Sequence, residues 1–198
     1  MKTVKFTRTE RPPAMPGQLG QPRSANLQWS LKPQDLALAL KLVLLRGERL
    51  PYKELGQQMR LSQFEAHAGV QRLLAARLVI EMEGVVRPIV GVLLPFMLHG
   101  APYAFPPVRG EMTIGFPTAY GVSPLKEKVL FAEENPPVWP HPEGTHRGTT
   151  LQPLYGNLPL AAQADPALYE LLALLDALRI GQARERELAA SLLQERLN

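Results

Sequence analysis

Residues 61–79, LSQFEAHAGVQRLLAARLV, decide the fold of this chain. Ser62 is a favourable helix N-cap, and Glu65 follows three residues later, which is the spacing of a capping box. Apolar residues then recur at helical spacing, at Ala66, Val70 and Leu73. The segment therefore predicts a helix that begins after Ser62, buries one face and ends near Arg77.

Two more helices are predicted before this one, and a hairpin after it. The first covers residues 33–47, because proline is favoured in a first helical turn and glycine at a helix end. The second is short and covers residues 52–59, after a proline. Residues 78–80 and 85–87 are rich in valine and isoleucine, and predict two strands joined by a turn at residues 81–84.

This order of elements is that of a winged helix-turn-helix. The run LKPQDL at 31–36 resembles the opening of the first DNA-binding-domain helix in MarR-type regulators, and Leu61-Ser62 resembles the step that introduces their recognition helix. The usual ending Ala-Gly-Leu-Val is similar to residues 76–79, where Arg77 replaces the glycine that suits a left-handed cap. Arg77 is therefore expected to be strained or to end the helix differently. The resemblance covers about residues 31–88 and implies DNA binding.

The third helix carries the predicted DNA-reading face. Opposite its apolar side lie Gln63, Phe64, His67, Ala68, Gln71 and Arg72. Glutamine can bond to adenine edges and arginine to guanine or phosphate, while the first helical turn can offer N–H groups to a phosphate. Arg87, just after the turn, could reach a minor groove or a phosphate. The predicted DNA-binding residues are Ser62, Gln63, His67, Gln71, Arg72 and Arg87.

An alternative is a winged helix that serves as a protein-interaction or antitoxin-like subunit, with the same face merely solvated. The face has few basic residues, and Glu65 opposes phosphate. The turn at 81–84 is also acidic. The two alternatives differ in salt dependence, because phosphate contacts weaken steeply as salt rises.

The net charge of +4 is unevenly distributed. Residues 1–28 carry five basic groups and one acidic group, residues 29–90 nine and six, and residues 91–198 eight and eleven. We expect a flexible basic arm at 1–28, a winged helix-turn-helix domain at 29–90 and a Pro-rich α+β body at 91–198. The basic arm could follow a neighbouring DNA groove or be a solvated tail.

The body is expected to contain strands and loops followed by helices, so that the fold class is α+β. Residues 89–98 are apolar and predict a buried strand or a short helix, whereas the Gly, Pro and aromatic residues of 100–121 favour short strands and turns over helices. Residues 134–140 are expected to be extended. Asp165 and Pro166 can begin a helix that Gly181 interrupts.

The leucines of the C-terminal segment 166–197 form a broad apolar face. They can pack inside one chain or build a homodimer, as the terminal helices of the regulators that the chain resembles do. We expect a homodimer, since palindromic DNA needs two reading helices. Residues 91–198 could also bind a protein partner.

Other function classes lack their signatures. The chain has no cysteine, which excludes disulfides, thiolate zinc sites and a cysteine nucleophile. His141 and His146 flank Glu143 without metalloprotease spacing, and no phosphate loop or nucleophile elbow is present. The apolar run 36–45 is too short to cross a bilayer, and no signal peptide is apparent. We expect a cytoplasmic, sequence-specific DNA-binding transcriptional regulator with double-stranded DNA as its partner, and no catalytic residue, cofactor, metal or membrane contact.

Overall fold

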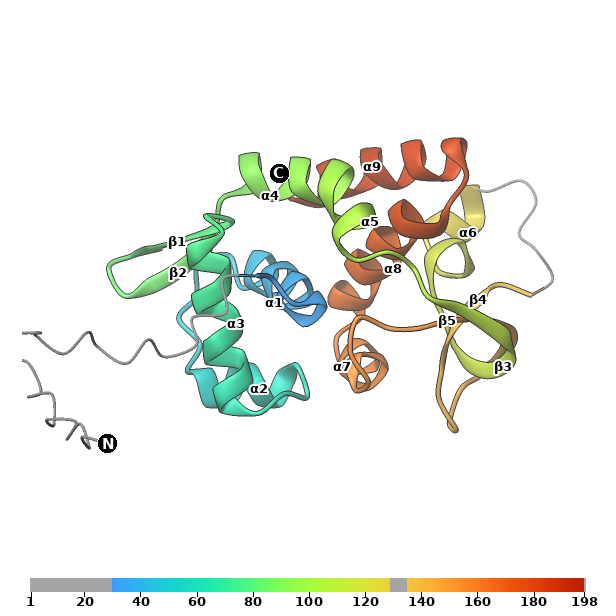
Figure 1. Cartoon of the computed structure of the whole chain (residues 1–198), viewed down its shortest axis with the longest axis horizontal. Coiled ribbons are helices and arrows are strands. Elements are labelled where there is room, and N and C mark those ends of the chain that lie inside the picture. Colours follow the sequence, from blue (N-terminus) through green and yellow to red (C-terminus); the bar gives the residue numbers. More distant parts are fainter. Residues whose placement is uncertain (1–29, 129–134, 198) are drawn as a thin grey trace, which may run out of the picture.

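The computed structural model describes residues 30–128 and 135–197. The predicted arm at 1–28 lies outside these residues. The chain has an α+β architecture, in which N-terminal helices and a hairpin precede a mixed three-stranded sheet and C-terminal helices (Figure 1). The hairpin lies at one end of the molecule and the three-stranded sheet at the other (Figure 1).

The N-terminal elements follow the expected order. They are α1 (Pro33–Leu44), α2 (Tyr52–Gln58), α3 (Gln63–Ala75), β1 (Val79–Met82) and β2 (Val85–Pro88). The hairpin turn is shorter than the predicted 81–84, because Glu81 and Met82 already pair with Val86 and Val85. Only two residues remain for the turn, and both Glu83 and Gly84 have positive φ, of 54° and 73°. This is the backbone of a type I′ turn, whose twist matches that of the strands.

All three N-terminal helices end at an arginine with positive φ. Arg46, Arg60 and Arg77 have φ of 49°, 54° and 56°. After α3, the N–H of Arg77 donates to Leu74 O at 3.0 Å and that of Leu78 to Leu73 O at 3.1 Å, which is a Schellman motif. Of the two outcomes expected for Arg77, the strained left-handed cap is the one found.

Residues 90–104 form a continuous helical segment. It consists of α4 (Val90–Pro95), the π-helical η1 (Phe96–Gly100) and α5 (Ala101–Ala104). The preference for strands and turns over helices was therefore wrong at residues 101–104. Leu93, Met97 and Ala101 recur every four residues and are fully buried, so tertiary packing holds the helix. Pro102 lies in the first turn of α5, where its missing N–H costs nothing.

The sheet at the far end is small and tightly closed. It contains β3 (Arg109–Pro117), β4 (Pro137–Pro140) and β5 (His146–Leu151). Of the segment 134–140 predicted to be extended, residue 134 lies outside the described residues and residues 137–140 form β4. β3 pairs antiparallel with both other strands, and β4 and β5 are parallel. A Cβ at Gly115 would collide with the carbonyl of Trp139, and one at Gly148 with that of Pro136. The glycines of this region are therefore required for close strand packing.

The C-terminal helices supply much of the core. Between the sheet strands β3 and β4 lie η2 (Ala119–Gly121) and α6 (Leu125–Lys128), and the chain ends in α7 (Leu158–Gln163), α8 (Pro166–Ile180) and α9 (Ala183–Leu197). Asp165 caps α8 by accepting from the N–H of Leu168 at 3.1 Å, and Gly181 ends it, as predicted. The leucines of both helices that are at most 3% exposed are Leu168, Leu171, Leu172, Leu174, Leu175, Leu178, Leu192 and Leu193. Packing within one chain thus accounts for these leucines.

Helix α1 lies between α3 and α8 (Figure 1), and its residues 35–42 are all buried. One contiguous apolar core includes residues from both sides of the boundary expected at 90/91. On the α8 side, the Nζ of Lys41 donates to Asp165 Oδ2 at 2.8 Å. Among the described residues, no helix is long and apolar enough to cross a membrane.

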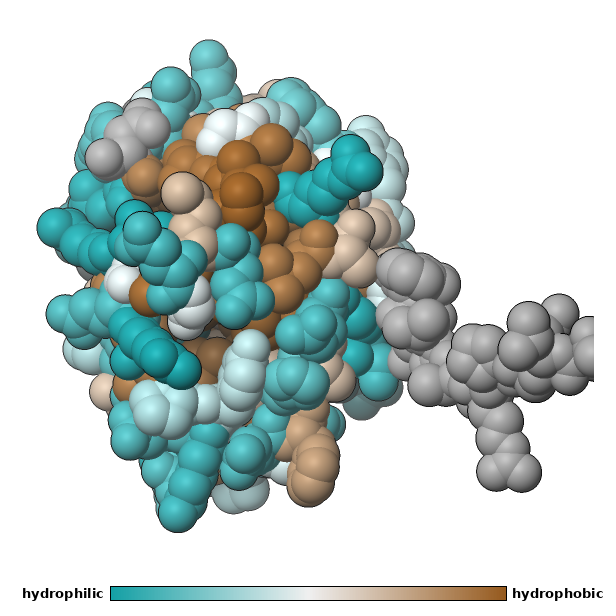
Figure 2. All heavy atoms as spheres, turned by 90° about the vertical axis from the view of Figure 1, so that its left-hand side faces the viewer, coloured by the Kyte–Doolittle hydropathy of each residue, from teal (hydrophilic) through white to brown (hydrophobic). Residues whose placement is uncertain are grey.

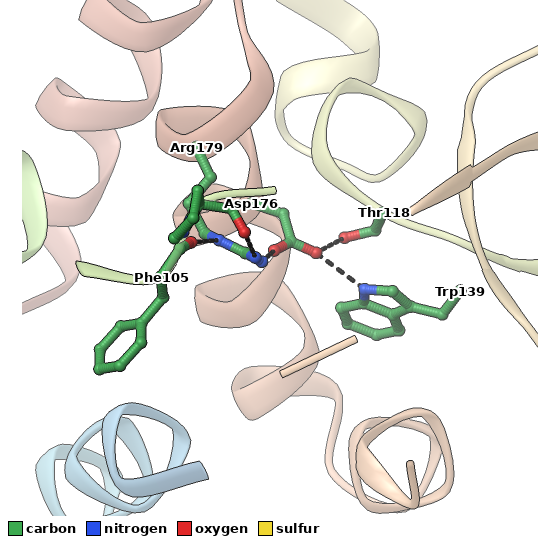
Figure 3. Close-up of polar contacts among 6 residues, drawn as sticks. Phe105, Thr118, Trp139, Asp176 and Arg179 are labelled. Carbon is green, nitrogen blue, oxygen red and sulfur yellow. Dashed lines mark hydrogen bonds and ion pairs between the residues drawn. The ribbon is translucent and has the colours of Figure 1, made fainter. Parts of the chain in front are cut away.

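A buried polar network joins α8 to the sheet region (Figure 3). Asp176 accepts from Thr118 Oγ1 and Trp139 Nε1 at 2.8 Å each, and from Arg179 Nη1 at 2.6 Å. The Nε of Arg179 also donates to the carbonyl of Phe105 at 2.9 Å. Burial raises the pKa of Asp176, while the Arg179 charge and the hydrogen bonds act in the opposite direction. With every partner satisfied, the network fixes the sheet on α8.

Candidate nucleic-acid interface

Helix α3 is fixed in place by a buried ion pair with α1. Arg72 donates from Nε and Nη2 to the two carboxylate oxygens of Asp35, both at 2.6 Å. The Asp35 side chain is 0% exposed and that of Arg72 9%. The hydrogen bond to Asp35 raises the pKa of Arg72 above its ordinary value, so the guanidinium stays charged. The expectation that Arg72 lies on the exposed face was therefore wrong, because its side chain turns inward to neutralise a buried carboxylate.

Gly69 makes this pair possible. A Cβ at that position would lie 2.9 Å from Asp35 Oδ1 and would collide with Leu38 Cδ1. The Asp35 carboxylate therefore occupies the space that a side chain at position 69 would fill. Asp35 is fixed from its own helix as well, since it accepts from the N–H of Lys32 at 2.8 Å.

The outward face of α3 carries the exposed side chains of Gln63, Phe64, His67 and Gln71, and Glu65 and Ala75 of the same helix are also exposed. Gln63, His67 and Gln71 follow one another at four-residue spacing and form one stripe about 12 Å long at 1.5 Å per residue. A helix with its side chains is about 10–12 Å across, so α3 can enter the DNA major groove, which is about 12 Å wide, with this stripe toward the bases. Phe64 is 87% exposed, and an apolar side chain there can contact a thymine methyl group.

His67 is held from beneath by the second helix. Its ring meets that of Tyr52 edge-on, with centroids 4.9 Å apart. The end of α2 is itself tied to the C-terminal body, because the Tyr155 hydroxyl donates to the carbonyl of Met59 at 2.6 Å. Burial raises the pKa of Tyr155, which keeps this hydroxyl protonated. The stripe on α3 therefore rests on a rigid support.

Ser62 acts as the helix cap that the sequence predicts. Its Oγ accepts from the N–H of Glu65 at 3.1 Å, and its own N–H donates to Glu65 Oε2 at 3.2 Å. The Glu65 carboxylate thus occupies the position that a phosphate would take at this helix end. This geometry favours a structural role for Ser62 over a phosphate contact.

Arg87 is exposed but lies at the base of the hairpin, opposite Ile80 in the ladder. Its guanidinium packs over Gly47, where an added Cβ would lie 3.1 Å from Arg87 Nε. The side chain therefore turns toward the end of α1, away from the hairpin turn. Arg87 and the α3 stripe thus form two separate features of the surface.

Exposed charges near α3 are almost balanced. Within residues 30–90 the exposed basic residues are Arg46, Arg49, Lys53, Arg60, Arg77 and Arg87. The exposed acidic residues are Glu48, Glu54, Glu65, Glu81 and Glu83. Lys41 and Arg72 do not add to the surface charge, because both are buried in ion pairs. Non-specific attraction to phosphate is therefore weak in this part of the chain.

The hairpin side of the molecule also exposes apolar groups. Figure 2 shows this side, with hydrophobic residues gathered in a band between hydrophilic ones. Ile80 and Met82 of β1 are 44% and 54% exposed, and Val92 of α4 is 45% exposed. Apolar side chains that gather on a surface are typical of protein contacts.

The histidines and acidic residues in the described part of the chain do not form a metal site. No group of three histidine or acidic side chains there could hold a metal ion. His141 packs against Phe116 with ring centroids 5.1 Å apart, and its Nδ1 accepts from the N–H of Glu143 at 3.1 Å.

Comparison with known proteins finds no match, whether among family models, curated proteins or solved structures.

Proposed function

We propose that this protein is a winged helix-turn-helix DNA-binding regulator that reads the major groove with the outward face of α3. The observation that carries the proposal is the stripe of Gln63, His67 and Gln71, which is exposed while the rest of α3 is anchored. In the described residues, neither glutamine side chain has a hydrogen-bond partner, so both amides are free for base edges. Glutamine can pair with adenine through two hydrogen bonds.

The contacts that hold α3 in place also fix the positions of the stripe residues. A reading helix must be rigid, because each base contact depends on position within a few tenths of an ångström. The ion pair of Arg72 with Asp35 and the ring of Tyr52 supply that rigidity from two directions. A homodimer that places two copies of α3 about 34 Å apart stays a prediction, now without the buried leucines as its basis.

The test starts from selection of bound duplexes out of a random-sequence pool, followed by anisotropy titrations of the selected duplex. Gln71→Ala is expected to weaken binding by about 5–150-fold, the equivalent of one lost base contact of about 1–3 kcal/mol. Gln194→Ala, an exposed glutamine on α9, is the matched control and should bind like the wild type. A pool from which no sequence is enriched would refute sequence-specific reading.

A protein-interaction or antitoxin-like role is the second candidate, favoured by the exposed Ile80 and Met82 beside the acidic Glu81 and Glu83. The two functions use different surfaces, so they can be separated in one experiment. A photo-crosslinking residue placed at Gln71 should yield DNA adducts in cells if α3 reads DNA. The same residue placed at Met82 should yield a protein adduct if the hairpin binds a partner.

A further inference from the structure

A cleft of about 370 Å³ lies where the end of α1 meets the hairpin base and the end of α9. It is lined by Leu42, Val43, Arg46, Gly47, Arg87, Pro88, Val90, Arg196 and Leu197. These residues come from both parts of the chain, so the cleft exists only because α9 returns to the N-terminal helices. Figure 1 shows this end of α9 beside α4.

Among the described residues, the charged side chains that line the cleft are all positive. Arg46, Arg87 and Arg196 line it, and no acidic residue does. Arg196 is partly neutralised, since its Nε donates to Glu170 at 2.7 Å. Arg46 and Arg87 form no ion pair with any described residue. The positive charges of Arg46 and Arg87 repel each other because they line the same cleft without a counter-ion. An anion bound in the cleft would offset this repulsion.

The rest of the lining is apolar. Leu42 and Leu197 are only 6% exposed, and Val43, Pro88 and Val90 are half-buried. Inorganic phosphate and a DNA backbone have no apolar part that could contact these side chains. A pocket for a small organic molecule, by contrast, combines apolar walls with a few fixed polar groups. The cleft therefore offers both parts that an amphipathic anion needs.

We propose that the cleft binds a small organic anion, in which a carboxylate or phosphate group meets Arg46 and Arg87 and an apolar body covers Leu42, Val90 and Leu197. Guanidinium groups bind both kinds of acid through paired, charge-assisted hydrogen bonds. The proposal goes beyond DNA recognition and does not depend on it. Bound ligand would link β2 and α1 to α9, so it would stabilise the fold.

The test uses the full chain without DNA. The probes are 4-phenylbutyrate and phenyl phosphate as the two acids, 4-phenylbutan-1-ol as the neutral match, and inorganic phosphate as the anion without an apolar body. Calorimetric titration should detect at least one of the two acids, and the stronger one identifies the head group. At 100 times its Kd, that acid should raise Tm by about 5–10 °C.

The decisive variant is Arg46→Gln/Arg87→Gln, which should bind the acid at least about tenfold more weakly. The control variant Arg147→Gln/Arg184→Gln removes two exposed arginines outside the cleft and should bind like the wild type. Tm without ligand shows whether each variant is folded. Because this titration contains no DNA, its result does not depend on whether α3 reads DNA.

Any one of four results would overturn the proposal. Equal binding of the alcohol would show that charge is not used, and equal binding of inorganic phosphate would show that the apolar floor is not used. Unchanged affinity in the folded Arg46→Gln/Arg87→Gln variant would place the ligand elsewhere. Displacement of the acid by any DNA duplex, but not by inorganic phosphate, would assign the arginines to a DNA backbone instead.

Discussion

Replacing Arg72 tests whether α3 is held from inside. Arg72→Ala leaves Asp35 fully buried, with the N–H of Lys32 as its remaining donor. Breaking a buried ion pair by removal of one partner costs about 3–5 kcal/mol, because a charge stays desolvated without compensation. A domain of this size has about 5–15 kcal/mol of stability, so the variant should lose a large part of it.

Urea unfolding followed by circular dichroism measures this loss. Gln71→Ala is the matched control on the neighbouring position, and it should change the free energy of unfolding by less than about 0.5 kcal/mol, because its side chain is exposed. Asp35→Ala should destabilise as much as Arg72→Ala. The double variant should lose less than the sum of the two, since no lone charge is left.

The opposite pattern would refute the reasoning. If Arg72→Ala unfolded at the same urea concentration as the wild type and bound selected DNA more weakly, the arginine would be a DNA contact and the buried pair would be unimportant. Additive losses in the double variant would show that Arg72 and Asp35 do not interact.

Two further predictions concern a helix end and pH. Arg77→Gly should stabilise the folded protein by about 0.5–1 kcal/mol, because glycine adopts positive φ without strain. The control Ala75→Gly, near the same helix end, should destabilise it by about 1 kcal/mol. Thermal unfolding of the two variants measures both changes. For Asp165, burial favours a higher pKa, but the bonds from Lys41 and the N–H of Leu168 outweigh it and lower the pKa. The contribution of the ionised Asp165 to stability is therefore present above pH of about 4 and is lost as the pH falls below that. Asp165→Asn should cost about 1 kcal/mol of unfolding free energy at pH 7 and progressively less toward pH 3. A difference in urea midpoint that stays constant with pH would contradict this.

The sequence predicted the elements whose signals are local. The capping box of Ser62 and Glu65 fixes where α3 begins, and the short apolar strands fix the hairpin. In the same way, Asp165 marks the beginning of α8 and Gly181 its end. Each of these signals acts within a few residues, so a single chain segment is enough to recognise it.

The direction of Arg72 could not be predicted from periodicity alone. On the helical face it lies between the buried Leu73 and the exposed Gln71, and its final position depends on a carboxylate 37 residues earlier. A signal was nevertheless present, because Asp35 directly precedes the apolar run 36–45 and a buried carboxylate requires a cationic partner. Gly69 was a second signal, since a glycine inside a helix costs stability unless another group needs its space.

The helical segment 90–104 was predicted only in part, because strand and short helix both stayed open for residues 89–98 and strands or turns were preferred at residues 101–104. Pro95 and Gly100 interrupt its pattern, and glycine and proline are the strongest local indications of turns. The segment is helical because Leu93, Met97 and Ala101 are buried in contacts with residues distant in sequence. The helical pattern predicts that Phe64 is exposed. Whether Phe64 can contact DNA also depends on whether another helix or strand covers it, which the pattern of one helix does not show.

Helix α1 explains why the two parts of the chain cannot be treated separately. Its Asp35 holds α3, its Lys41 holds the cap of α8, and its C-terminal end borders the arginine cleft. A shift at the start of α8 must therefore move α1 or strain the pair of Lys41 with Asp165, and a shift of α1 would act on α3 through the pair of Asp35 with Arg72. A ligand that fixes α9 against α1 thus acts on a helix that is bonded directly to α3. The physical route from the body to the proposed DNA-reading face is one buried helix with an ion pair on each side.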